Sequence, residues 1–513
     1  MNRRKFLSRS AAWTSITLGY ARHAFSQNKE VVLTLRASES GRSVPVNFTG
    51  LSYELAQLAE PSFFNERHND LVAMFRRLSP SGILRVGGNS SEFCWFRASA
   101  ETVAPKLHVP AGNLSNNWMP HRLFEITPTA IDALAGFLRA TGWTAIYGLN
   151  FGNSSPERAA VEAAYVRQTL GDRLAFFQIG NEPDFYHKAN NGTRPTSWGF
   201  SDYVREWLGF ADAILQRVPD ARFGGPDTGA SSDWVVRFGE GVAPKLGKRL
   251  VALTGHYYVE GPPNDPRVTT QRLLAGDPSV VTSTEAIVHA ADQHDLVYHM
   301  TEGNSCYRGG KPGMSNAFAS ALWAGDYLLT LASLGCGGVN LHGGQSHFLS
   351  ASLGDHNPGL RSAGDHRQAV SNGFYTPIRS EPGEVSFAQP IYYGMLLAQQ
   401  FAGATMLKVD PLPLAEVTAY AGVRDDRRLV ALFNKSASTD VTVMLRAGGA
   451  VSHASTWKLS GPALDATSGV TLGGSSVSSD GGWQPRANPL PVSRNEVRVR
   501  LAAASGLLVF LEG

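Results

Sequence analysis

Eight short apolar segments recur between residues 44 and 400, and stretches with the spacing of amphipathic helices lie between them. Such segments are typical of strands in a parallel sheet, which are covered on both faces and so read as near-continuous apolar runs. The segments are 47–54, 83–88, 144–151, 174–183, 222–228, 251–259, 296–304 and 338–344, and the clearest helical stretches are 129–140, 156–170, 201–217 and 314–334. This alternation predicts an α/β fold, and the number eight favours a closed (β/α)8 TIM barrel. A doubly wound open sheet is the alternative, but no Gly-x-Gly-x-x-Gly turn follows the first segment.

The pattern changes after residue 403, where short segments rich in β-branched and aromatic residues alternate with Gly, Ser, Asp and Asn turns. These segments are 416–423, 429–434, 441–446, 455–459, 496–501 and 507–511. Because no helical stretch separates them, they predict an antiparallel β-sandwich. Segment 31–37 alternates apolar and polar residues and has no place in the barrel, so we expect it to join the sandwich. The predicted division is 27–44 for this strand, 45–403 for the barrel and 404–513 for the sandwich.

Residues 1–26 resemble a twin-arginine export signal. Arg3 and Arg4 precede a moderately apolar run at 11–20, and small residues follow at Ala21, Ala24 and Ser26. No later apolar run reaches the roughly 20 residues that a membrane span needs. We therefore expect an exported protein, periplasmic or extracellular, with no membrane association in its mature form.

The charge of the chain changes once this segment is set aside. The formal net charge is +3, but the predicted signal holds five basic residues and no acidic one. The remainder is slightly acidic and carries no Lys/Arg block, which argues against a nucleic-acid or strongly polyanionic partner. The sequence gives no indication of the oligomeric state.

Cysteine and histidine spacing does not support a metal centre. Cys94, Cys306 and Cys336 form no Cys-x-x-Cys pair, and they predict buried thiols rather than a disulfide framework. The histidines at 342, 347, 356 and 366 lie among Gly, Ser and Asp residues, which we interpret as a loop. We therefore predict no metal ion and no cofactor.

Two carboxylates follow apolar segments directly. Glu182 lies near the end of the fourth segment, in the sequence Asn181-Glu182-Pro183, and Glu302 lies near the end of the seventh. Active sites of barrels lie at the carboxyl ends of the strands, and three strand-and-helix units place the second acid across the mouth from the first. Glycoside hydrolysis needs such a pair, one acid to protonate the leaving oxygen and one carboxylate to attack the anomeric carbon or activate water. Taken alone, Asn-Glu-Pro is equally compatible with an ordinary polar turn.

Other strand ends contribute further polar side chains. The first segment ends in Glu54, and Asn89 follows the second. His256 and Tyr258 lie two apart, hence on one face of the sixth strand, beside the seventh. Tyr258 is therefore a candidate donor to Glu302, whereas His256 fits a packing role almost as well as a binding role.

Four stretches together resemble a known family. They are ILRVGGNSSEF at 83–93, NEP at 181–183, HYY at 256–258 and TEGNSCYRGG at 301–310. These residues resemble glycoside hydrolase family 79, the heparanase and β-glucuronidase family within the clan of retaining (β/α)8 glycosidases. The resemblance implies a β-glucuronidase acting on a glucuronic-acid-containing oligosaccharide or glycoside, with Glu182 as acid/base and Glu302 as nucleophile.

The resemblance also implies a set of substrate-binding residues. This set is Glu54 (for a ring hydroxyl), Asn89, Asn181, His256, Tyr258, Tyr307, Gly309 and Tyr375. Within it, Tyr307, the amide of Gly309 and Tyr375 would hold the sugar carboxylate, and Asn181 would contact the 2-hydroxyl. Arg308 is a departure, because the heparanase branch has glycine at this position, and its role stays open.

Other functions remain as alternatives. We favour exo-action, with segment 345–372 lying over the mouth and closing one end of the cleft; an endo-acting, heparanase-like enzyme is the alternative. Another retaining glycosidase of the clan, such as an arabinofuranosidase or xylosidase, is disfavoured by Tyr307 and Gly309. Outside enzymes, a carbohydrate-binding protein on an inactive barrel is disfavoured because both glutamates are present.

Overall fold

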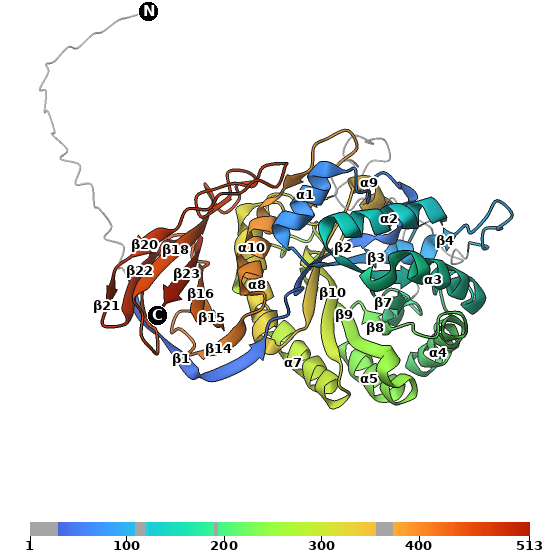
Figure 1. The fold of residues 1–513 in the computed structure, drawn as a ribbon, viewed down its shortest axis with the longest axis horizontal. Coiled ribbons are helices and arrows are strands. Elements are labelled where there is room, and N and C mark those ends of the chain that lie inside the picture. Colours follow the sequence, from blue (N-terminus) through green and yellow to red (C-terminus); the bar gives the residue numbers. More distant parts are fainter. Residues whose placement is uncertain (1–28, 108–118, 121, 189–192, 355–372) are drawn as a thin grey trace, which may run out of the picture.

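The structure is a computed structural model that describes residues 29–107, 119–120, 122–188, 193–354 and 373–513. The predicted export signal at 1–26 and the histidines at 356 and 366 lie outside these residues. Figure 1 shows two parts side by side, a barrel ringed by helices and a smaller group of strands next to it. Within the described ranges, no helix is both long and apolar enough to cross a membrane.

Eight strands close into the predicted barrel. In barrel order they are β2 (Thr49–Glu54), β3 (Ile83–Gly87), β6 (Thr144–Leu149), β7 (Leu174–Ile179), β8 (Phe223–Thr228), β9 (Leu250–Glu260), β10 (Val297–Cys306) and β11 (Gly338–Gly343). Every neighbouring pair is parallel, and β11 returns to pair with β2. The (β/α)8 prediction is confirmed, and the doubly wound open sheet is wrong.

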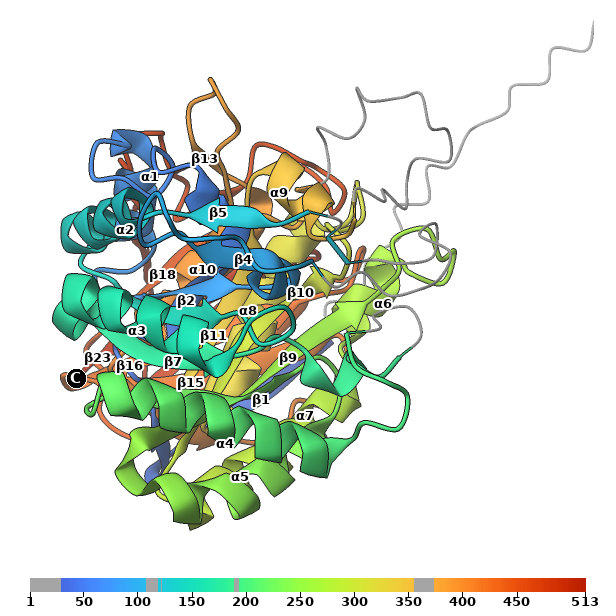
Figure 2. The ribbon, with the colours of Figure 1, turned by 90° about the vertical axis from the view of Figure 1, so that its right-hand side faces the viewer.

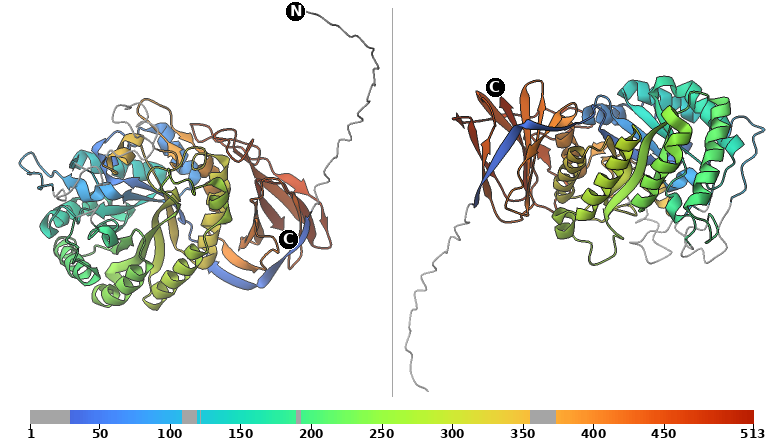
Figure 3. Two further views of the ribbon diagram at one scale, coloured as in Figure 1. Left: turned by 180° about the vertical axis from the view of Figure 1, so that it is seen from behind. Right: turned by 90° about the horizontal axis from the view of Figure 1, so that it is seen from below.

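Helices surround the barrel (Figure 3). They are α1 (Asn69–Leu78), α2 (Pro128–Thr141), α3 (Pro156–Leu170), α4 (Phe200–Arg217), α5 (Ser232–Leu246), α6 (Thr270–Ala275), α7 (Pro278–Gln293), α8 (Phe318–Leu334), α9 (Ser346–Ala351) and α10 (Pro390–Ala398). Figure 2 shows α2 to α5 stacked one below another on the outside of the strands. Short polar side chains begin several of them; Thr127 accepts from the Ala130 amide and Ser155 from the Arg158 amide. Of segment 345–372, predicted to be a loop, the first part forms α9, and 355–372 lie outside the described residues.

The second domain is a curled, mostly antiparallel sheet of eleven strands. Its strands are β1 (Lys29–Ser43), β14 (Thr405–Val409), β15 (Val417–Arg424), β16 (Arg427–Asn434), β17 (Val441–Arg446), β18 (His453–Ser460), β19 (Thr471–Leu472), β20 (Asn488–Leu490), β21 (Val492–Ser493), β22 (Glu496–Leu501) and β23 (Ser505–Glu512). Two small sheets, β4 (Cys94–Phe96) with β5 (Phe124–Ile126) and β12 (Ile378–Arg379) with β13 (Phe387–Ala388), accompany the barrel.

The strand predicted at 31–37 joins this sheet as β1, but not in a purely antiparallel arrangement. β1 pairs with β14 antiparallel and with β17 parallel. The strand is 15 residues long, and its register shifts between Arg36 and Ser40. Its first part, Lys29–Thr34, pairs with β17 and its second part, from Leu35 onward, pairs with β14, so β1 joins these two strands in one continuous sheet.

A partly buried polar cluster connects the barrel helices with the sheet. Asp326 on α8 accepts hydrogen bonds from Thr418 at 2.5 Å and from Tyr420 at 2.7 Å, both on β15. Its other oxygen pairs with Lys435 Nζ at 2.8 Å. On the next face of α8, α10 packs closely at Gly394, where a Cβ atom would overlap the backbone oxygen of Ala321.

We expect Gly394→Ala to lower the unfolding temperature, because overpacking of a tight helix contact costs about 1–3 kcal/mol. Thermal unfolding followed by circular dichroism measures the change. Gly209→Ala on α4 is the matched control, since no atom lies within 4 Å of the added Cβ. There the better helix propensity of alanine stabilises by up to about 1 kcal/mol. A Gly394→Ala variant as stable as Gly209→Ala would contradict this account of the α8–α10 contact.

Candidate active site

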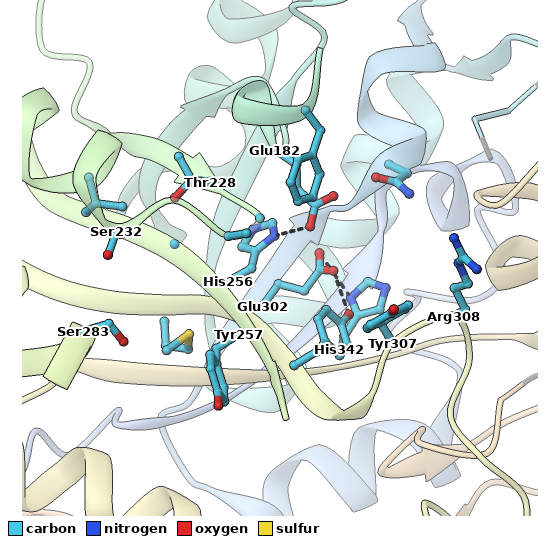
Figure 4. A pocket seen from close by; sticks show the side chains of 18 of the residues that line it. Glu182, Thr228, Ser232, His256, Tyr257, Ser283, Glu302, Tyr307, Arg308 and His342 are labelled. Atoms are coloured by element: carbon cyan, nitrogen blue, oxygen red, sulfur yellow. Dashed lines mark hydrogen bonds and ion pairs between the residues drawn. The ribbon is translucent and has the colours of Figure 1, made fainter. Parts of the chain in front are cut away.

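A cavity of about 680 Å³ opens at the carboxyl ends of the barrel strands. Its lining includes Glu54, Asn89, Glu182, His256, Tyr258, Glu302, Tyr307, Arg308, His342 and Tyr375. Figure 4 shows Glu182, His256 and Glu302 converging at the centre, with Tyr307 and Arg308 on one side and Thr228 and Ser232 on the other. Side chains from β2, β7, β9, β10 and β11 therefore meet in one space, as a closed barrel requires.

Glu182 turns into the cavity immediately after β7. Its φ of +51° lies in the left-handed region, which non-glycine residues seldom adopt. The backbone amide of Glu182 donates to the Asp227 carbonyl at 2.9 Å, so the ends of β7 and β8 are tied together. A Cβ atom on Gly229 would approach the carboxyl carbon of Glu182 to 2.8 Å. The backbone thus holds the acid in one place, and only glycine fits beside it.

Glu182 and Glu302 form a close pair with different electrostatic surroundings. One oxygen of each carboxyl group and one nitrogen of His256 lie within 4.8 Å of one another. Burial raises the pKa of Glu182, while its hydrogen bond with His256 opposes the rise. Burial also disfavours ionisation of Glu302, but nearby His342, His256 and Arg85 outweigh it, and the pKa of Glu302 falls to about 2. One acid therefore retains its proton more readily, and the other is ionised.

Both oxygens of Glu302 accept strong hydrogen bonds. The Tyr258 hydroxyl donates to Oε1 at 2.8 Å, the contact expected from strand order, and Arg85 Nη1 donates to Oε2 at 2.5 Å. Donors to an ionised carboxylate are worth more than donors to a neutral acceptor. These two bonds fix the orientation of the Glu302 carboxylate.

Arg85 is the main site residue outside the set predicted from the sequence. It lies on β3 and is 1% exposed. Its Nη2 donates to Asp227 Oδ2 at 2.6 Å and to Asn181 Oδ1 at 2.7 Å. Burial disfavours the charge of Arg85, but Asp227 and Glu302 raise its pKa. The feature that could have identified Arg85 is its position inside an apolar segment. An arginine buried in a strand needs charged or polar partners, which indicates a buried polar site.

Asp227 and His342 were also outside the predicted set. Asp227 is the penultimate residue of β8, with φ of +66° and 1% exposure. His342 ends β11, where Nδ1 contacts the Ser52 hydroxyl at 2.9 Å and Nε2 lies 3.4 Å from Glu54. The Gly-rich surroundings of His342 predict a loop, but the residue lies in strand β11. His347, predicted in the same loop, instead pairs with Glu60 at the surface.

The residues predicted to bind sugar hydroxyls occupy different depths. Glu54 accepts from the amide and hydroxyl of Ser90 at 2.9 and 2.6 Å. Asn181 is buried and does not line the cavity; its Nδ2 donates to Asn89 Oδ1 at 3.1 Å, and its oxygen is engaged by Arg85. Glu54 and Asn89 thus face the cavity, whereas the amide of Asn181 is occupied by protein partners.

The residues predicted to bind the sugar carboxylate surround Tyr258. The ring centroids of Tyr307 and Tyr375 lie 6.4 and 6.3 Å from that of Tyr258. Arg308, Gly309 and Gly310 have successive φ values of 59°, 86° and 86°, so the loop after β10 turns sharply. This turn presents Tyr307 and Arg308 to the cavity, while Gly309 is buried and outside its lining.

Glu182, His256 and Glu302 are the group among the described residues whose potential ligand atoms converge enough for a metal ion. Both ring nitrogens of His256 face carboxylates, however, with Nδ1 3.2 Å from Glu182 and Nε2 3.1 Å from Asp227. A metal ion would need a lone pair on one of these nitrogens, which a ring protonated on both nitrogens does not offer. The three cysteines are free and buried.

Curated proteins show sequence similarity to the chain, although no protein-family model matches it. A β-glucuronidase of Aspergillus niger is 25% identical over 390 residues, which cover 71% of this chain and 65% of that protein. A heparanase of Gallus gallus is 24% identical over 337 residues, or 57% of this chain and 62% of that protein. The chain thus spans less than two thirds of the length of these relatives.

Solved structures show the same fold. A 4-O-α-L-rhamnosyl-β-D-glucuronidase from Fusarium oxysporum 12S has a TM-score of 0.72 at 18% identity, over 93% of this chain and 99% of that one. At this identity the likeness establishes the fold. The similarity to curated β-glucuronidases and a heparanase, together with the motifs around Glu182 and Glu302, supports the resemblance to glycoside hydrolase family 79, the heparanase and β-glucuronidase family.

Proposed function

We propose that the chain is a retaining β-glucuronidase that releases terminal β-D-glucuronate from oligosaccharides or glycosides. The observation that carries this proposal is the pair Glu182 and Glu302, whose oxygens lie within 4.8 Å and whose pKa values shift in opposite directions. Retaining glycosidases hold their two carboxyl groups about 5 to 5.5 Å apart, and inverting enzymes roughly 6.5 to 9.5 Å apart. The close approach supports double displacement.

In the first step, a Glu302 oxygen forms a bond to the anomeric carbon while the glycosidic C–O bond breaks, and the Glu182 proton passes to the leaving oxygen. In the second step, the Glu182 carboxylate takes a proton from water, whose oxygen attacks the anomeric carbon and releases Glu302. The net reaction consumes one water and restores both side chains. The low pKa of Glu302 and the raised pKa of Glu182 match the protonation states that the first step needs.

Glucuronate recognition is the finer part of the proposal. The cavity already holds the carboxylates Glu54, Glu182 and Glu302, so an anionic sugar needs donors to offset their repulsion. Tyr307, Tyr375 and the amide of Gly309 are the donors implied by the family motif. Arg308 adds a cation on the same side, with its guanidinium 5.6 Å from the Tyr307 ring centroid.

Exo-action and export complete the proposal. Ser352 and Leu353, which follow α9, and Met119 contribute to the lining of the cavity. This supports removal of terminal glucuronate over internal cleavage. Export rests on the twin-arginine pattern at 1–26 alone.

Assays on paired aryl β-glucuronides test the roles of the two acids. We expect Glu302→Gln to abolish turnover. For Glu182→Gln we expect kcat/KM to fall about 10²–10⁴-fold with a poor leaving group such as phenol, because proton donation is lost. The same variant should lose far less with 2,4-dinitrophenol, which departs without a proton. Substantial Glu302→Gln activity, or equal Glu182→Gln losses on both substrates, would refute these assignments, and anomeric inversion seen by NMR would refute retention.

The preference for glucuronide over glucoside tests Arg308 and Tyr307. A hydrogen bond to a charged group contributes about 1.5–3 kcal/mol, so Arg308→Gly should reduce the ratio of kcat/KM values by about 10–100-fold. Glycine suits this position because φ is +59°. Tyr307→Phe should reduce the ratio in the same direction. Lys188→Met is the matched control, since Lys188 lies 3.7 Å from the Phe185 ring centroid on the Glu182 side of the cavity. An unchanged ratio in Arg308→Gly, or an equal loss in Lys188→Met, would remove Arg308 from carboxylate recognition.

A further inference from the structure

We propose that Asp227 is a positioning residue that keeps His256 protonated on both ring nitrogens, so that the Nδ1–H of His256 is aimed permanently at the carboxyl group of Glu182. This inference rests on the proposed function, in which Glu182 alternates between acid and base. It gives a positioning role to Asp227, a carboxylate that contacts neither the substrate nor the nucleophile Glu302.

The geometry around His256 defines its protonation. The side chain is 0% exposed and lies between two carboxylates, with Nε2 3.1 Å from Asp227 Oδ1 and Nδ1 3.2 Å from Glu182 Oε1. A neutral imidazole donates from one nitrogen only. Whenever Glu182 is ionised, as it is before the second step, a neutral ring would place a lone pair against one of the two carboxylates. In that state both contacts are attractive only when the ring is an imidazolium.

Asp227 is itself fixed on every side. Arg85 Nη2 donates to Oδ2 at 2.6 Å, and Gln178 Nε2 donates to Oδ1 at 2.5 Å. The Thr301 hydroxyl also donates to Oδ1. In addition, the Asp227 carbonyl accepts from the Glu182 amide. Asp227 thus orients Glu182 twice, once through the backbone and once through the His256 ring.

The charges agree with this arrangement. Burial alone lowers the pKa of His256, but Asp227 and Glu302, with the hydrogen bond to Glu182, raise it to about 10. Arg85 also faces this ring, with Nη2 3.5 Å from Nε2, and its positive charge opposes protonation of His256, so the carboxylates must outweigh it. Burial opposes the charge of Asp227, yet Arg85 and His256 lower its pKa. His299, buried in the same barrel beside the neutral amide of Asn340, behaves oppositely, because burial there lowers its pKa to about 4.

The chemical consequence concerns both steps of the reaction. Besides His256, the charged groups that face Glu182 are Glu302 on β10 and Asp184 in the turn after β7, and both raise its pKa. Without a cation beside it, Glu182 would hold its proton too firmly to act as the base of the second step. A His256 ring that stays protonated throughout the cycle limits the rise in the pKa of Glu182 in both steps.

Asp227→Asn tests the proposal through the pH profile of kcat/KM, whose alkaline limb follows the pKa of Glu182 in the free enzyme. Asparagine removes the charge that keeps the ring protonated, so the pKa of His256 falls toward its ordinary value of about 6.5. The positive charge of the His256 ring next to Glu182 is then lost. The negative charge removed from Asp227 is farther from Glu182 than the ring is. The pKa of Glu182 rises, and the alkaline limb should move upward by about one pH unit or more.

Asp184→Asn is the matched control. Asp184 accepts from the amides of Gly229, Ala230 and Ser231 and acts on Glu182 directly. Removing its charge should move the alkaline limb downward, opposite to Asp227→Asn. A downward shift in Asp227→Asn would make Asp227 an ordinary neighbouring charge, and loss of activity with an unmoved limb would make its role structural; either result overturns the proposal.

Nitrogen NMR of wild-type protein with isotope-labelled histidine tests the protonation state of His256 directly. This test depends neither on enzyme activity nor on the folding of the Asp227→Asn variant. The His256 signals are assigned from their loss in His256→Gln. At pH 8 both nitrogens of His256 should carry protons, while His299 should show one bare nitrogen. A bare nitrogen on His256 at pH 8 would overturn the proposal. Absence of aryl glucuronide hydrolysis by the wild type, with His256 doubly protonated, would instead refute the proposed function alone.

Discussion

The charge of Arg85 inside the barrel is the interaction on which the rest of the site depends. A guanidinium at 1% exposure is costly to remove from water, and the cost is offset only when ionised partners with good geometry surround it. Asp227 and Glu302 supply those charges, and Asn181 supplies a further acceptor. One cation from β3 therefore fixes a group just after β7, one near the end of β8 and one within β10. Loss of Arg85 would leave two buried carboxylates with reduced compensation.

The barrel makes this concentration of charge possible. Parallel strands end at the same edge, so side chains far apart in the sequence meet there without long loops. Glu182 and Asp227 both adopt positive φ at strand ends, a conformation that costs free energy for non-glycine residues. The hydrogen bond between their backbones, together with the buried contacts of Asp227, holds them in it. The stability of the surrounding strands thus maintains the local geometry of the acid.

Much of this arrangement is readable from the sequence, and the parts that are not have physical reasons. Eight apolar segments identify the barrel because strands covered on both faces leave that pattern. Glu182 and Glu302 stand out because each interrupts such a segment at its end. Arg85 and Asp227 are harder to recognise, since what distinguishes them is a partner across the barrel, and pairing distance is not encoded in local pattern. The parallel pairing of β1 with β17 could not be predicted for the same reason. Alternation of apolar and polar residues predicts a strand, but it does not predict which strand lies beside it.

The position of β1 has a consequence for how the molecule is assembled. This strand precedes the whole barrel, yet its neighbours β14 and β17 follow the barrel in sequence. Closing such a distant pairing costs loop entropy, and contacts of this kind form slowly. During synthesis, the apolar face of β1, with Val31, Leu33 and Leu35, has no sheet to join until the C-terminal strands emerge. The two ends of the described chain therefore complete their shared sheet last, after the barrel between them has been made.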